Sequence, residues 1–246
     1  MIEQGVLENP HVDAVFGMHV DQHAPVGTIN TAGGPVAAAA DSCVIVIKGR
    51  GGHGAYPHTT VDPIVVAAQI VIALQTVVSR EIDPIKSGVV SVGMIRAGEA
   101  NNVIPDTTEM RLTIRSFDPA VRKLQQKRIT EIATGIAEAL GATAKVDYKL
   151  GYPAMINDQA MANLVLDVAT EALGADRVSI GDPQMGAEDF SYFLEQRPGC
   201  FYNVGTRNEE KGLIWGHHHP RFDMDEEGFA AGIEVMTRVV MRYLND

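Results

Sequence analysis

Cysteine and basic residues are scarce in this sequence. Among 246 residues there are two cysteines, Cys43 and Cys200, which lie far apart in apolar runs and form no CxxC pair. This pattern argues against a disulfide scaffold and predicts two buried free thiols in a reducing, cytoplasmic setting. Lys and Arg total 20 against 31 Asp and Glu, a net charge of -11, so nucleic acid is not an expected partner.

Long hydrophobic runs are also missing. The nearest candidate, Ile64 to Leu74, follows a helix cap and is shorter than the ~18 residues that span a bilayer, so no membrane partner is expected. With 46% hydrophobic and 21% charged residues, the composition is typical of a soluble globular protein. A chain of this length can form one large domain or two smaller ones.

The stretch from 41 to 150 has a pattern of its own. Its periodicity and its two Asp-Pro helix caps predict alternating strands and helices. The predicted elements are a strand at 42–48, a helix at 62–79, strands at 89–95 and 107–116, a helix at 118–140 and a strand at 143–149. This order predicts a ferredoxin-like βαββαβ module. In its first helix we expect an inward face made of Ile64, Val65, Ala68, Ile72 and Val78.

The segments 1–40 and 151–246 have the character of one α/β domain into which that module is inserted. Apolar strands are predicted at 13–20, ending near His19, and at 200–205. Helices are predicted over 159–173, 188–196 and 226–244. The last helix is amphipathic, with an expected inward face of Phe229, Ile233, Met236, Val240 and Tyr243.

Two histidines outside the module are candidate metal ligands. His19 ends a predicted strand, and His218 lies in a His-His-His run in a loop before the last helix. Neutral imidazole is a common ligand of zinc-like ions, although a single histidine in an apolar run is more often a satisfied core residue. Glu188 and Asp189 either complement a helix dipole or face the same pocket.

Inside the module, three polar side chains could bind a substrate. His53 lies on a glycine-flanked turn, Asn102 on a loop between strands, and Arg115 on the polar face of the strand at 107–116. Such a set suits a substrate with an amide to polarise and a carboxylate to bind, because Arg binds carboxylates in a bidentate fork. The alternative is a solvated sheet face beside a cluster of turn glycines.

Taken together, five motifs resemble those of the aminoacylase and carboxypeptidase type of metal-dependent amidohydrolases. The closest branch is that of hippurate hydrolases and N-acyl-amino-acid amidohydrolases. The motifs occur in the family's order along the chain: Gly-Met-His19-Val, Gly-Gly-His53-Gly-Ala-Tyr-Pro-His, Asn102-Val-Ile-Pro-Asp, Met-Gly-Ala-Glu188-Asp-Phe and His218-His-Pro-Arg-Phe.

The resemblance implies a zinc-peptidase-like α/β domain, present in part, with an inserted lid domain. It implies His19 and His218 as ligands of a divalent metal (Zn, Mn, Co or Ni), with Glu188 beside the metal and the substrate. The lid would form a homodimer. Its His53 would stabilise the oxyanion in the partner's active site, while Asn102 and Arg115 would hold the substrate.

Two further motifs of that family are not found in these residues. They are of the His-x-Cys-Gly-His-Asp and Pro-x-Glu-Glu types and supply the remaining ligands and the general base. We therefore expect a C-terminal part of such an enzyme, inactive alone. The alternative is a non-catalytic dimerisation or partner-binding module from a truncated gene. A thiol hydrolase based on Cys200 and His218 is disfavoured, because nothing near Cys200 would lower its pKa.

Overall fold

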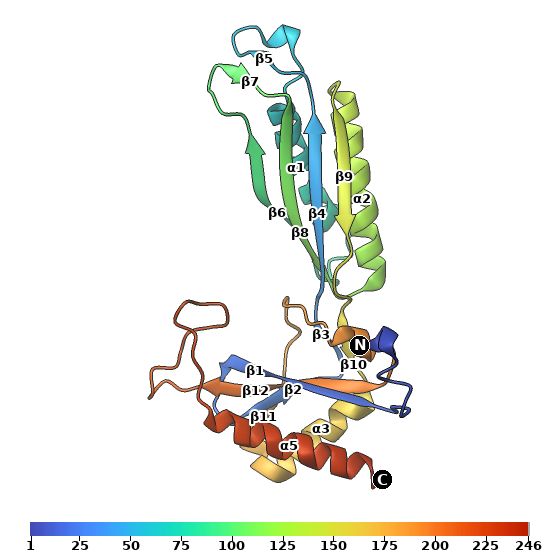
Figure 1. The fold of residues 1–246 in the computed structure, drawn as a ribbon, viewed down its shortest axis with the longest axis vertical. Helices are drawn as coiled ribbons and strands as arrows, with labels where there is room; N and C mark the ends of the chain where they lie inside the picture. The colour runs from blue at the N-terminus through green and yellow to red at the C-terminus, as the bar shows by residue number, and fades with distance from the viewer. Residues whose placement is uncertain (246) are drawn as a thin grey trace. The chain divides into compact units, whose positions relative to one another are not determined.

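The computed structural model describes residues 1–245 and divides into two compact units. Unit 1 comprises Met1–Ala37, Met155–Gln184 and the residues from Glu188 onward, whereas unit 2 comprises Ala38–Ala154 with Met185–Ala187. The chain thus leaves unit 1 and later returns to it, and Figure 1 shows unit 2 as a separate body of strands and helices.

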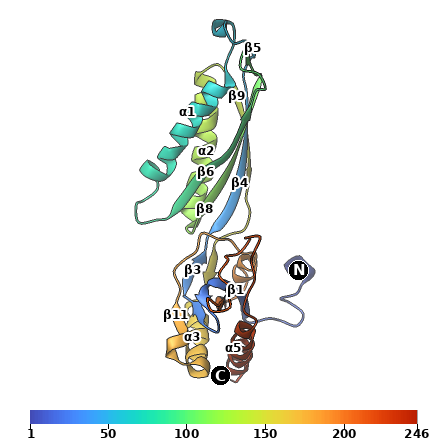
Figure 2. The same cartoon turned by 90° about the vertical axis from the view of Figure 1, so that its left-hand side faces the viewer.

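Unit 2 has the predicted ferredoxin-like fold. In chain order it contains β4 (Ala39–Lys48), α1 (Pro63–Thr76), β6 (Gly88–Ala97), β8 (Thr107–Ser116), α2 (Pro119–Ala139) and β9 (Thr143–Lys149). The strands pair in the order β6-β8-β4-β9, and all neighbours are antiparallel. Both helices lie on one face of this sheet (Figure 2). The βαββαβ prediction is confirmed.

Local signals explain where the two helices begin. The side chain of Asp62 accepts a hydrogen bond from the Ile64 N–H at 2.8 Å, and Asp118 caps α2 in the same way through Ala120. A proline follows each cap, at a position where no intrahelical N–H is needed. Beyond Thr76, α1 continues into a π-helical turn at Val77–Glu81.

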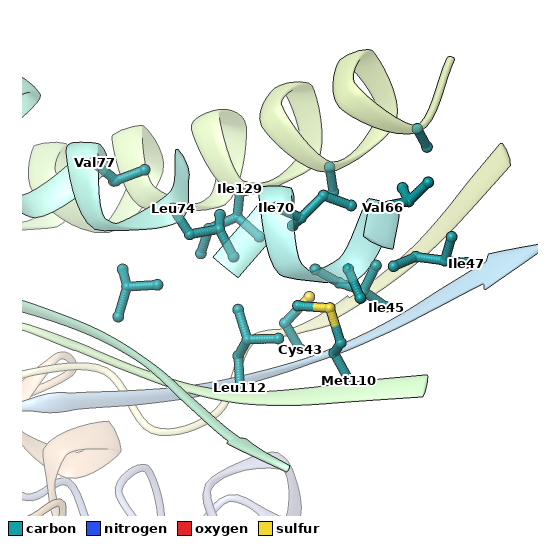
Figure 3. Packing of buried hydrophobic residues seen from close by; sticks show 14 of the residues in the cluster. Cys43, Ile45, Ile47, Val66, Ile70, Leu74, Val77, Met110, Leu112 and Ile129 are labelled. Carbon is teal, nitrogen blue, oxygen red and sulfur yellow. The ribbon is translucent and has the colours of Figure 1, made fainter. Parts of the chain in front are cut away.

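The inward face of α1 differs from the prediction. The residues buried against the sheet are Val66, Ile70, Leu74 and Val77, as Figure 3 shows, whereas Ile64, Val65 and Ile72 are exposed. The helix is apolar on nearly every side, so periodicity alone could not select a face. By length and composition, Pro63–Glu81 is apolar enough to cross a membrane, but one face of it packs in the core of unit 2.

A buried carboxylate, that of Asp41, connects β4 to α2 and to the residues at and just after the end of β9. Asp41, near the start of β4, accepts hydrogen bonds from both Nε and Nη2 of Arg122 on α2. It also accepts from the Tyr148 hydroxyl and from the N–H of Gly151, each at 2.9 Å. Burial alone would raise the pKa of Asp41, but these hydrogen bonds outweigh burial and hold the pKa below its usual range.

Unit 1 is built on a mixed sheet with the strand order β1-β12-β2-β11. Its strands are β1 (Val15–Pro25), β12 (Gly199–Arg207), β2 (Ile29–Thr31) and β11 (Val178–Ile180). A second sheet pairs β3 (Gly34–Ala37) with β10 (Met155–Asn157). Helices α3 (Gln159–Leu173) and α5 (Glu227–Tyr243) pack on the main sheet (Figure 1).

The inward face of α5 also differs from the prediction. Small residues, among them Gly228, Ala231 and Gly232, face the sheet, while Phe229 and Ile233 are exposed. A Cβ on Gly232 would come within 3.1 Å of the Val204 side chain, so the missing side chain permits close contact with β12. The predicted helix at 188–196 is only the short α4, Ser191–Leu194.

Candidate functional site

The sequence predicted a strand that ends near His19, but His19 lies in the middle of β1, which runs from Val15 to Pro25. This strand pairs in parallel with β12, and His19 lies opposite Asn203. The His19 ring is exposed, with Nδ1 2.7 Å from the carbonyl oxygen of Val20. The strand runs on to Pro25, further than predicted, and carries Gln22 and His23 beyond His19.

A loop between β12 and α5 brings the run of three histidines to this strand. The ring of His217 lies 5.3 Å from that of His19 and 6.5 Å from that of His23, measured between ring centroids. The prediction paired His19 with His218. The imidazole that packs against His19 is that of His217, which the sequence analysis did not name as a ligand because the family motif points to the second histidine of the run.

His218 has an unusual backbone conformation. Its φ is 65°, the only positive φ of a non-glycine residue within 1–245. A side chain in this left-handed region costs about 1–2 kcal/mol, and such strain is concentrated at functional positions. The backbone geometry therefore supports a functional role for His218 that does not depend on its sequence motif.

Burial, together with the neighbouring imidazoles of His19 and His23, lowers the pKa of His217. This ring is therefore neutral at physiological pH, and its Nε2 accepts a hydrogen bond from the Gln22 N–H at 3.4 Å. Within 1–245, no group of three or more His, Cys, Asp or Glu side chains is arranged to hold a metal ion. The imidazoles here are suitable donors, but they make only part of a metal site.

Glu188 lies in unit 1, just before α4. Its Oε1 accepts a hydrogen bond from the Asp189 N–H at 2.9 Å, and its carbonyl accepts one from the Ser191 hydroxyl at 2.7 Å. No hydrogen bond or ion pair of its side chain with a histidine is found within 1–245. Because α4 has only four residues, a helix-dipole role explains little of this position.

His53 and Asn102 meet at one end of unit 2. Short strands β5 (Gly52–His53) and β7 (Val103–Ile104) pair there, and the N–H of Gly54 donates to the Asn102 carbonyl at 2.8 Å. A Cβ on Gly54 would lie 3.1 Å from the Asn102 backbone, so glycine permits this approach. Nδ1 of His53 accepts from the Ala55 N–H at 3.0 Å, so its neutral ring carries the proton on Nε2 and presents it as a donor.

Arg115 lies at the other end of the same sheet. It is eight residues beyond Thr107, the first residue of β8, which at about 3.4 Å per residue corresponds to about 27 Å. Its Nη1 donates to the Thr113 hydroxyl at 2.6 Å and to the Ile114 carbonyl at 2.9 Å, and no acidic side chain within 1–245 forms an ion pair with it. The structure therefore unites His53 with Asn102 but separates both from Arg115.

The two cysteines offer no nucleophile. Burial raises the pKa of Cys43 to about 12 and that of Cys200 to about 11, and both thiols are inaccessible. A thiol with so high a pKa carries almost no thiolate at neutral pH, which argues against a thiol hydrolase based on Cys200.

Comparisons with known proteins identify the family. Residues 1–242 match peptidase family M20/M25/M40. The chain is 37% identical to thermostable carboxypeptidase 2 of Saccharolobus solfataricus, in a match that covers 100% of this chain and 61% of that protein. It is 39% identical to N-acetyl-L-cysteine deacetylase of Bacillus subtilis, in a match that covers 92% of this chain and 52% of that protein.

The solved structures agree with this result. The YXEP protein of Bacillus subtilis, described as a dinuclear metal binding peptidase from the M20 family, superposes with a TM-score of 0.80 at 33% identity. The match covers 99% of this chain and 60% of that one, so the chain spans about three fifths of these relatives. The chain belongs to peptidase family M20/M25/M40.

Proposed function

We propose that the protein to which these residues belong is a cytoplasmic, metal-dependent hydrolase of the amide bond in N-acyl amino acids, with hippurate-like compounds as the model substrate. The observation that carries the proposal is the histidine cluster beside β1, where the ring of His217 packs against that of His19 and His218 follows in a strained backbone conformation. Relatives named as a deacetylase of an N-acetyl amino acid and as a carboxypeptidase support this substrate class.

In this proposal His19 and His218 bind a divalent metal ion, which is Zn, Mn, Co or Ni. A divalent ion in such a site polarises the substrate carbonyl and lowers the pKa of a water molecule. The residues within 1–245 do not complete an ordinary three-ligand site. Further donors would come from the additional length that the relatives have.

Unit 2 supplies the groups that recognise the substrate. His53, with its proton on Nε2, and the amide of Asn102 donate hydrogen bonds to the carbonyl oxygen as negative charge develops there. Arg115, which has no acidic partner within 1–245, binds the carboxylate of the amino acid in a bidentate fork. Glu188 would lie beside the metal and the substrate, as the family resemblance implies.

The separation of these groups supports a homodimer. A span of about 27 Å along β8 exceeds the length of a hippurate-type molecule, so one substrate can contact Asn102 and Arg115 only if they come from two chains. Pairing of two β6 edges about a twofold axis would place one end of each sheet beside the opposite end of its partner.

The surface of unit 2 favours β6 for this pairing. Beside that edge, α1 exposes the uncharged side chains of Ile64, Val65 and Ile72. Strand β6 itself exposes one charged side chain, Arg96, whereas the opposite edge strand, β9, exposes Lys145, Asp147 and Lys149. Charged side chains on an edge strand oppose pairing with another chain, and an apolar helix face promotes it.

The proposal predicts no turnover by the 246-residue chain alone. The assay measures cleavage of hippurate and of N-acetyl-L-cysteine in the presence of Zn²⁺, Mn²⁺, Co²⁺ or Ni²⁺. Cleavage that a chelator and the substitution His218→Ala both abolish would show that the chain is a complete enzyme. Lack of turnover in a protein of the relatives' full length, with each metal supplied, would contradict the proposed activity itself.

A further inference from the structure

Gln22 connects strand β1 to the loop between β12 and α5 that carries His217, His218 and His219, called here the histidine loop. It lies three residues after His19 on β1 and has no exposed surface. Its Nε2 donates to the carbonyl of Leu213 in the loop at 2.7 Å, and its Oε1 accepts from the Thr206 hydroxyl at 2.8 Å. Both ends of the buried amide are thus satisfied, and one of them holds the loop.

The backbone of Gln22 makes a second contact with the same loop. Its N–H donates to Nε2 of His217 at 3.4 Å, next to His218. The carbonyl of Thr206, itself fully buried, accepts from the N–H of Asp225 at 3.0 Å, close to the end of the loop. Gln22 therefore contacts the loop directly at two places, Leu213 and His217. It is also connected, through Thr206, to Asp225 near the end of the loop.

A buried amide at this position needs an explanation, because an aliphatic side chain would fill the same space without a desolvation cost. Unlike dispersion contacts, a hydrogen bond is directional and fixes the distance between its two partners. Here the partners are the strand that carries His19 and the loop that carries His218. Gln22 is thus placed to fix the distance between two histidines that the sequence separates by almost 200 residues.

We propose that Gln22 is a positioning residue that holds the His217–His219 segment against His19 and thereby sets the affinity of the chain for Zn²⁺. This inference rests on the proposed function, in which His19 and His218 bind the metal. Loss of a residue that orients metal-binding groups typically weakens metal binding by about 10- to 100-fold.

The test compares Gln22→Met with the matched control Gln125→Met. Gln125 is equally buried, lies in unit 2, and donates from Nε2 to the carbonyls of Val89 and Arg115, so its loss removes similar hydrogen bonds elsewhere. Zn²⁺ affinity of the 246-residue chain is measured by calorimetry for both variants and the wild type. Thr206→Val, which removes only the bond to Oε1, serves as a milder variant if Gln22→Met does not fold.

A second readout follows the loop without any metal. Trp215 is the only tryptophan, and its ring stacks on that of His219 at 4.3 Å, with the Arg221 guanidinium 5.0 Å from its centroid. Quenching of its fluorescence by acrylamide therefore reports solvent access to this loop alone. We expect Gln22→Met to increase quenching, and Gln125→Met to leave it at the wild-type value.

The expected result is increased quenching together with Zn²⁺ binding weakened roughly tenfold in Gln22→Met, and neither change in Gln125→Met. Unchanged quenching, or a loosened loop with unchanged Zn²⁺ affinity, would overturn the positioning role. The variants His19→Ala and His218→Ala test the metal assignment separately. If both bind Zn²⁺ like the wild type, the proposed ligands are wrong, whatever the result for Gln22.

Discussion

Replacing Asp41 by asparagine should destabilise unit 2 far more than the loss of one charge on a surface would. The carboxylate has 1% of its side chain exposed and accepts four hydrogen bonds, two from Arg122 and one each from Tyr148 and Gly151. All four groups that face the carboxylate are donors in this arrangement. An asparagine amide has one oxygen to offer, so its NH₂ group would face two of these donors.

The magnitude follows from this geometry. Two hydrogen bonds to a charged group are lost, and the Arg122 guanidinium, with 18% of its side chain exposed, loses the carboxylate to which its Nε and Nη2 donate. Removal of one partner of a buried ion pair costs about 3–5 kcal/mol, and we expect this range for Asp41→Asn. The free energy of unfolding is measured by urea denaturation at pH 7.

The control is an exposed ion pair on a helix. Glu234 and Arg238 on α5 are i,i+4 neighbours with well-exposed side chains, so Glu234→Gln should cost no more than about 0.5 kcal/mol. A similar cost for Asp41→Asn would refute the reasoning. The double variant Asp41→Asn with Arg122→Met should recover part of the loss, because it also removes the guanidinium donors that the asparagine NH₂ group would face.

The same network predicts a pH dependence. Its hydrogen bonds hold the pKa of Asp41 below the usual value of about 4, so the unfolded chain binds this proton more readily than the folded one. The stabilisation by Asp41 is present above pH ~4 and is lost as the pH falls through the lowered pKa. The wild type should therefore lose more stability below pH 4 than Asp41→Asn.

Three further predictions concern the thiols, the strained histidine and the dimer. The pKa values of Cys43 and Cys200 are raised to about 12 and about 11, so neither thiol should react with a thiol reagent in the folded protein at pH 8, whereas both should react in urea. Rapid reaction without denaturant would show that they are not buried. His218→Gly should raise the free energy of unfolding by about 1 kcal/mol in urea denaturation, since glycine adopts φ 65° without strain, while Zn²⁺ binding falls; a loss of stability would contradict the strain. Ile72→Asp should convert a dimer to a monomer in sedimentation equilibrium, whereas Ile85→Asp, at a 90% exposed position off α1, should not; an unchanged Ile72→Asp dimer would exclude the α1 face.

The sequence by itself determined the elements of unit 2 to within a few residues. Three of these elements carry a clear local signal, namely strict alternation in Thr107–Ser116 and an Asp-Pro cap before each of the two helices. The order of these elements then left few topologies, and the ferredoxin-like one is observed.

Other features depended on tertiary contacts. The inward face of α1 was decided by packing, because a helix that is apolar on nearly all sides has no periodic preference, and that of α5 by glycines that let it approach β12. The extended conformation of β8 from Thr107 to Arg115 carries Arg115 far from Asn102, although the sequence places these two residues only thirteen positions apart. The position of the loop between β12 and α5, to which Gln22 donates two hydrogen bonds, decided that His217 packs against His19. No local sequence pattern encodes a contact between residues so far apart in the chain.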